Sequence, residues 1–192
     1  VMFLASLVGL PVPLLPIQIL WINLVTDGLP ALALGMDPVD PGIMNRPPRV
    51  SGEPVVGRHS GFALVTQGFF IALCTLAGFL YIYKFEGRDL PYARTAAFMI
   101  LSCSQLFHAF NCRSSFQSIF KLGLFTNMKL VGAVLISFAF QLSVVSLPFC
   151  QTVFKTQWLG LRDMLIIILL ASFPLWAMEL VKIRRRQKML AR

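Results

Sequence analysis

Residues 22–30 read INLVTDGLP, and they lie within an apolar run that extends over residues 17–34. An apolar segment of this length predicts a helix that crosses a membrane, which needs about 20 residues. An aspartate at the centre of such a helix costs roughly 2.5–3.5 kcal/mol, and an interior proline costs about 3 kcal/mol. The segment carries both penalties within four residues, so we expect a bound partner to offset them.

The side chains of this stretch indicate which partner. On an α-helix Asn23, Thr26 and Asp27 stand at i, i+3 and i+4 and share one face. Their amide, hydroxyl and carboxylate oxygens are the hard ligands that calcium prefers. Gly28 and Pro30 predict a helix break that frees the carbonyl of Thr26. In the alternative interpretation Asp27 pairs with a buried base and Pro30 only kinks the helix, but no lysine or arginine lies in the middle of any predicted span.

Composition places this segment in a membrane protein. Hydrophobic residues make up 57% of the 192 residues and charged residues 13%, whereas soluble domains have about 45–50% and about 25%. We predict an all-α, polytopic transmembrane helix bundle with one partial and five full spans. The expected parts are the end of a truncated helix (1–10), the ion-site helix (17–35, apolar over 17–34), a proline-rich loop (36–60), four further transmembrane helices within 61–181 (61–83, 92–112, 129–147 and 161–181), and a basic tail (182–192).

Basic residues predict the orientation of the bundle. They concentrate in the loop 36–60, in segment 113–129 and in the tail, which holds six of the 17 lysines and arginines. The positive-inside rule therefore predicts that the loop and the C-terminus are cytoplasmic. The tail is expected to contact anionic lipid rather than nucleic acid, because no folded basic surface is predicted.

Polar residues occur in two other predicted spans. Gln105, His108 and Asn111 recur every three residues on one face, which is typical of interhelical hydrogen bonding, with a position near the ion as the alternative for Gln105. Glu179 and Lys182 lie one turn apart near the end of the last span. We expect them to form a surface pair.

The segment QILWINLVTDGLPALALGMDPVDPGIMNRPPR, residues 18–49, closely resembles the sixth transmembrane helix and following cytoplasmic loop of P-type calcium-transporting ATPases. The resemblance implies that Asn23, Thr26 and Asp27 are calcium ligands, with Asp27 bridging or lying between the two ion positions of the family. It implies that the chain runs from the end of the fifth helix through the tenth. It also implies a loop that couples the ion site to the phosphorylation domain, with Asp37, Asp40, Arg46, Pro47, Pro48 and Arg49 as its residues.

Two departures qualify this resemblance. Gln105 aligns where two-site members carry a glutamate, so the chain is more similar to one-calcium members, with Gln105 as a supporting or second-site ligand. The DKTGT phosphorylation motif is absent from the sequence. The chain alone is therefore not expected to be catalytic, and Mg²⁺ and ATP would act only through actuator, phosphorylation and nucleotide-binding domains that it lacks.

The expected function is thus the membrane part of a calcium-pumping translocase, in the plasma membrane or an intracellular membrane. Two alternatives remain open on the residues alone. One is a stand-alone membrane module, channel-like or scaffolding, without ATP chemistry. The other is a pump for manganese, which accepts the same oxygen ligands.

Overall fold

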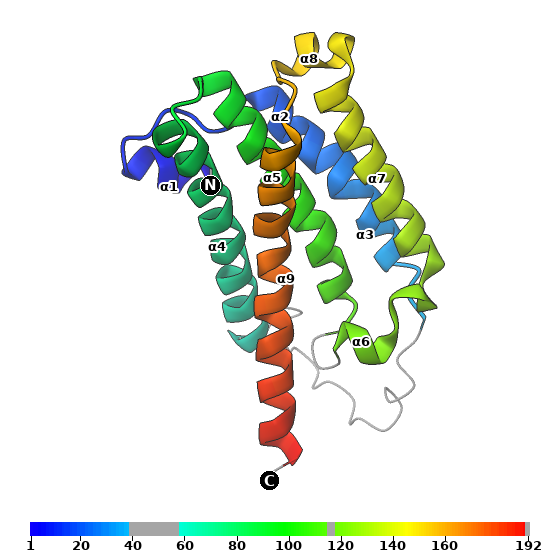
Figure 1. The fold of residues 1–192 in the computed structure, drawn as a ribbon. Coiled ribbons are helices and arrows are strands. Elements are labelled where there is room, and N and C mark those ends of the chain that lie inside the picture. The colour runs from blue at the N-terminus through cyan, green and yellow to red at the C-terminus, as the bar shows by residue number, and fades with distance from the viewer. Residues whose placement is uncertain (39–57, 115–117, 191–192) are drawn as a thin grey trace.

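The computed structural model describes residues 1–38, 58–114 and 118–190, and within these ranges it contains helices and no strands. Figure 1 shows the long helices arranged side by side as a bundle, with the C-terminus extending from one end. The helices are α1 (Met2–Leu7), α2 (Pro16–Trp21), η1 (Ile22–Thr26), α3 (Gly28–Leu34), α4 (Arg58–Leu80), η3 (Tyr81–Phe85), α5 (Leu90–Cys112), α6 (Ile119–Leu122), η4 (Leu124–Thr126), α7 (Met128–Ser146), α8 (Pro148–Phe154) and α9 (Leu161–Leu190). The predicted all-α bundle is confirmed.

Four helical segments in the described residues are long and apolar enough to cross a membrane: Pro16–Leu34, Leu64–Phe85, Met128–Ser146 and Leu161–Lys182. Each lies within a few residues of a predicted span. The remaining predicted span, 92–112, is the 23-residue helix α5, which is not among these four. That α5 also crosses the membrane stays a prediction.

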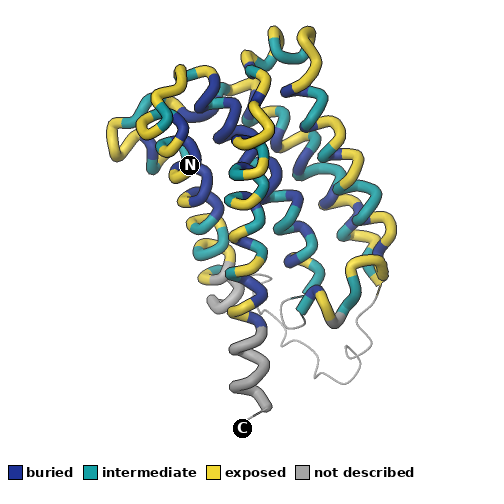
Figure 2. The backbone as a smooth tube through the Cα atoms, viewed as in Figure 1, coloured by how far each residue is buried: buried dark blue, intermediate teal, exposed yellow. Residues whose placement is uncertain are grey.

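Helix α5 differs because it lies inside the bundle. Ala96 through Ile100 are all buried, and the dark tube of α5 in Figure 2 runs between more exposed helices. A helix that faces other helices need not present an apolar surface to lipid, which explains its lower hydropathy. Close packing is visible at Gly78 of α4, where an added Cβ would lie 2.2 Å from Cδ1 of Ile100.

The predicted boundaries differ from the structure mainly at the ends. Pro16 is the first residue of α2, where its missing N–H costs nothing. Residues 1–10 contain the six-residue helix α1, and their assignment to a partial span stays a prediction. Helix α4 begins at Arg58, inside the predicted loop, and α9 continues to Leu190 through most of the predicted tail. Of the coupling-loop residues, Asp40, Arg46, Pro47, Pro48 and Arg49 lie outside the described residues.

Candidate ion site in the membrane helices

The ion-site helix is interrupted before the break that the sequence predicts at Gly28 and Pro30. Residues Ile22–Thr26 form a π-helix, and the amide of Asp27 donates to the carbonyl of Ile22, five residues earlier, at 3.0 Å. Such π-turns are uncommon in proteins as a whole, but those that occur are often at functional sites. The interruption thus coincides with the residues that carry the polar side chains.

Gly28 and Pro30 lie in a helix and not at the predicted helix break. Helix α3 begins at Gly28 and runs through Pro30, which is buried in its first turn. Proline is tolerated there because first-turn amides have no helical acceptor. Pro30 therefore lies in the first turn of the second helical segment, and the wide π-turn before this segment interrupts the helix.

The π-turn also changes the spacing of side chains along the ion-site helix. An α-helix stacks residues four apart, whereas the π-turn closes at i to i+5. Thr26 is only 1% exposed, while Asn23 is exposed. The shared face of Asn23, Thr26 and Asp27 as ion ligands stays a prediction.

Asp27 faces Gln105 of the central helix α5. The Gln105 amide Nε2 donates to Asp27 Oδ2 at 3.4 Å, a long contact compared with the usual 2.7–3.2 Å. The other amide atom, Oε1, is buried and has no hydrogen-bond partner in the described residues. Since an amide can turn over, this Oε1 can replace Nε2 beside the carboxylate when both oxygens face a cation. The structure thus brings Gln105 to Asp27.

Among the described residues, no neighbouring base balances the charge of Asp27. The ion pairs formed between described residues join Asp37 with Arg113, Glu86 with Arg162 and Glu179 with Lys182. None of these reaches Asp27. A half-buried carboxylate without a base is costly, and a bound cation offsets that cost.

Thr26 adds a further oxygen beside Asp27. Its hydroxyl donates to the carbonyl of Ile22 at 2.7 Å, so its lone pairs stay available to accept. The described residues contain no group of three or more histidine, cysteine or acidic side chains that could hold a metal. A site here would rest on one carboxylate with neutral oxygens, a donor set that suits a hard cation.

Sequence reasoning missed the residues of α7 that support this turn. The Ser137 hydroxyl donates to the carbonyl of Val25 at 3.0 Å, and the Gln141 Oε1 accepts from the Trp21 indole at 3.0 Å. Both polar residues are buried. Their i, i+4 spacing inside an apolar span is the signal that could have identified them.

The end of the ion-site helix is held by a set of paired groups that we term the Asp37 clasp: Asp37, Arg113, Asn127 and the loop residues Gly123 and Thr126. Asp37 accepts from Arg113 Nε at 3.1 Å and from Asn127 Nδ2 at 2.8 Å. Arg113 also donates to the Gly123 carbonyl at 2.8 Å and the Thr126 hydroxyl at 2.9 Å. The clasp joins the residues after α3 to the connection between α5 and α7.

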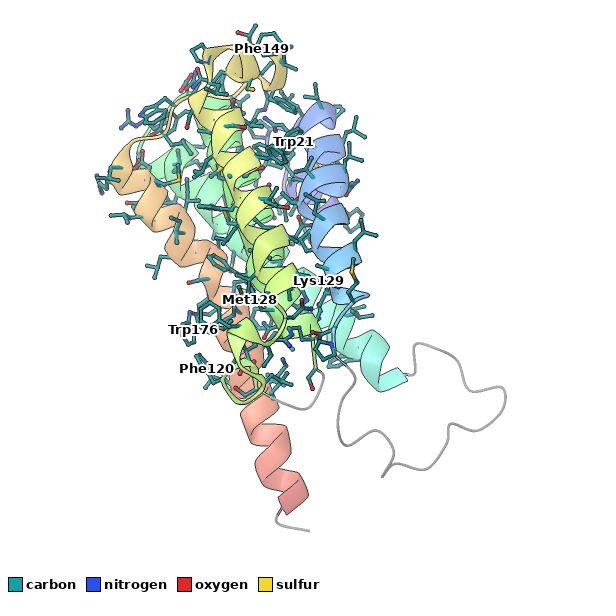
Figure 3. The ribbon with its side chains drawn as sticks, turned by 90° about the vertical axis from the view of Figure 1, so that its right-hand side faces the viewer. Trp21, Phe120, Met128, Lys129, Phe149 and Trp176 are labelled. Atoms are coloured by element: carbon teal, nitrogen blue, oxygen red, sulfur yellow. The ribbon has the colours of Figure 1, made fainter. Side chains whose placement is uncertain are left out.

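The predicted surface pair of Glu179 and Lys182 is wrong. The two residues are 3% and 5% exposed, because α5 and α6 cover them. Lys182 Nζ donates to the Asn111 carbonyl at 3.0 Å and approaches Glu179 at 3.4 Å. Glu179 accepts from the Ser118 hydroxyl and the Ile119 amide. Beside this cluster, Figure 3 shows Phe120 near Trp176 at the lower end of the bundle, and their rings stack with centroids 6.1 Å apart.

Comparison with known proteins identifies relatives that share most of the chain. It is 44% identical over 174 residues to a "Calcium-transporting ATPase" of Bacillus subtilis (strain 168), covering 91% of this chain and 19% of that protein. It is 40% identical to "Calcium-transporting ATPase 1" of Bacillus cereus (strain ATCC 10987 / NRS 248), covering 96% and 22%. It is 37% identical to "Calcium-transporting ATPase type 2C member 2" of Mus musculus, covering 94% and 19%.

These matches also define which part of the relatives the chain represents. It spans about a fifth of the length of the curated relatives it matches. The family described as "Cation transporting ATPase, C-terminus" matches residues 11–184, which is nearly the whole chain. The chain therefore belongs to the cation-transporting ATPase family, as its C-terminal region.

Proposed function

We propose that this chain is the ion-binding membrane part of an ATP-driven calcium pump, which exports Ca²⁺ from the cytoplasm by alternating access. The observation that supports it most is the half-buried contact between Asp27 and Gln105, in which the carboxylate has no base and the amide oxygen has no partner in the described residues. The names of the relatives support calcium as the cargo.

The proposed ligands are Asp27, Gln105, Thr26 and Asn23. The exposed Asn23 would face the ion together with parts of the pump outside this chain. Asp27 supplies the charge, and the neutral oxygens supply further ligands. Mg²⁺ and ATP act through the actuator, phosphorylation and nucleotide-binding domains, which this chain does not contain. Phosphorylation transports the ion only if the two states of the pump bind it with different affinity.

The proposed coupling path is the loop that follows α3. Asp37 holds its first residues against Arg113, so a movement of the loop is transmitted to the end of the ion-site helix. We place this loop and the C-terminus in the cytoplasm because basic residues concentrate there. The pump would lie in the plasma membrane or an intracellular membrane.

The decisive test is Asp27→Asn in the complete protein. Without the carboxylate charge we expect calcium-dependent phosphorylation by ATP to fall by about 100-fold or more at the calcium concentration that half-saturates wild type. The matched control is Asp163→Asn, because Asp163 is another carboxylate within the bundle, but it is buried and bonds to Tyr92. Wild-type phosphorylation in Asp27→Asn would refute the assignment.

Two further measurements separate the alternatives. A native polypeptide near 21.4 kDa would indicate a stand-alone membrane module, whereas one several times larger would indicate that the catalytic domains are joined to it. Competition between Ca²⁺ and Mn²⁺ for phosphoenzyme formation would identify a manganese pump, because both ions accept these ligands.

A further inference from the structure

An apolar groove lies between two membrane-spanning helices at the end of the bundle away from the C-terminus. It is formed where α4 and η3 meet the first turns of α9, which lie side by side in Figure 1. Its volume is about 620 Å³, within the usual range of ligand sites. The lining residues are Ala77, Leu80, Tyr81, Phe85, Ile166 and Leu170.

Two charged side chains stand at the polar end of this groove. Glu86 directly follows the lining residue Phe85, and Arg162 precedes the lining residue Ile166 by four positions, or about one helical turn. Arg162 Nη2 lies 3.7 Å from Glu86 Oε1, which is too long for a hydrogen bond. The groove therefore ends at a loose pair of opposite charges.

Neither member of this pair is fully used. The Arg162 side chain is 77% exposed and can present guanidinium donors to a ligand. The Glu86 side chain is 14% exposed, and its Oε1 has no hydrogen-bond partner in the described residues. The Arg162 guanidinium can therefore bind an anionic group, and the Glu86 carboxylate can accept hydrogen bonds from a cationic group, at the polar end of the apolar groove.

We propose that this groove binds a phospholipid with a primary-amine headgroup. Its acyl chain lies along Leu80, Tyr81 and Ile166, its phosphate contacts Arg162, and its ammonium donates to Glu86. The zwitterion matches the opposite charges of the pair, and an ammonium can donate hydrogen bonds that a quaternary choline cannot. Lipid is the occupant because both walls belong to apolar spans, so acyl chains are what the groove meets in a bilayer.

This site is independent of Asp27 and does not require that the chain binds calcium. It is tested with the complete protein in nanodiscs that contain phosphatidylethanolamine carrying a photoreactive group on its acyl chain. Peptide mass spectrometry then locates the crosslinks. We expect labelling concentrated in residues 77–85 and 166–170.

Two variants test the groove and the headgroup contact separately. Ala77→Trp fills the groove at an exposed position and should reduce labelling there about tenfold, whereas Arg162→Gln should reduce it about fivefold by removing the phosphate contact. The matched controls are Leu135→Trp, an exposed position on α7, and Lys84→Gln, an exposed cation on η3. Neither control should change the labelling.

Three outcomes would overturn the proposal. They are labelling spread evenly over all lipid-facing helices, equal labelling by a phosphatidylcholine probe of the same acyl chain, and crosslinks at 77–85 to another protein in place of lipid. The last result would assign the groove to a membrane-spanning partner.

Discussion

Two regions of this apolar bundle contain charged side chains, and they differ in how those charges are paired. Around Glu179 and Lys182, both charges are buried, paired and hydrogen-bonded to α5 and α6. Around Asp27, the carboxylate is half-buried, and among the described residues its side chain has one long hydrogen-bond contact, with Gln105. The buried Gln105 Oε1 and His108 Nδ1 have no partner in the described residues.

This difference separates a structural cluster from a binding site. Buried polar groups that are fully paired hold helices together, and removing one partner destabilises the fold because the other group is left buried and unpaired. Buried polar groups that are left unpaired cost stability, and a ligand that pairs them is favoured by the same amount. Breaking the first region should therefore affect stability, and breaking the second should affect ion affinity.

The largest effect is expected from Lys182→Met, which leaves Glu179 buried without its cation. We expect a loss of about 3–5 kcal/mol in the free energy of unfolding, measured on the complete protein in detergent. The calcium concentration for half-maximal phosphorylation should be unchanged. Lys84→Met, at an exposed lysine, should alter neither quantity, and a calcium defect at normal stability in Lys182→Met would contradict the distinction.

The Asp37 clasp should show a smaller stability effect. Arg113→Leu removes the cation from Asp37, which keeps its bond from Asn127, so we expect a loss of about 2–3 kcal/mol. Arg113→Leu with Asp37→Leu should recover part of this loss, because no charge is then left unpaired. If the double variant is less stable than the sum of the single changes predicts, the clasp is not a coupled pair.

At the ion site, Gln105→Leu should change affinity and spare stability. Loss of the amide oxygen is expected to weaken calcium binding about tenfold, as measured by calcium-dependent phosphorylation. Gln105→Glu keeps an oxygen at this position and adds a negative charge, so it should bind calcium at least as well as wild type. Normal affinity in Gln105→Leu would remove Gln105 from the site.

The smallest effect is expected from Ser137→Ala, which removes the hydroxyl that donates to the Val25 carbonyl. One neutral hydrogen bond contributes about 1 kcal/mol, which corresponds to a few-fold loss of calcium affinity if the π-turn relaxes. Ser146→Ala, at an exposed position on the same helix, is the control. An equal effect in both variants would show that Ser137 does not support the turn.

The sequence by itself determined the membrane class, the approximate bounds of the helices and the residue that needs a partner. Apolar length is a local property of the chain, so the end of α3 and the boundaries of α5 and α7 follow from it closely. Asp27 was identifiable because a carboxylate in an apolar run is costly wherever the run lies.

Only the tertiary structure decided between the two interpretations of Gln105, by bringing it to Asp27, and it also decided how the helix is interrupted and which charges are buried. Gln105 lies 78 positions from Asp27, and a separation of that size is closed by helix packing, which no local pattern records. Ile22–Thr26 forms a π-turn in place of the predicted α-helix, and the carbonyls of Ile22 and Val25 in this turn accept from Thr26 and from Ser137 of α7. Glu179 and Lys182 are typical of a solvated helix end in sequence, and they are buried because α5 and α6 pack over them.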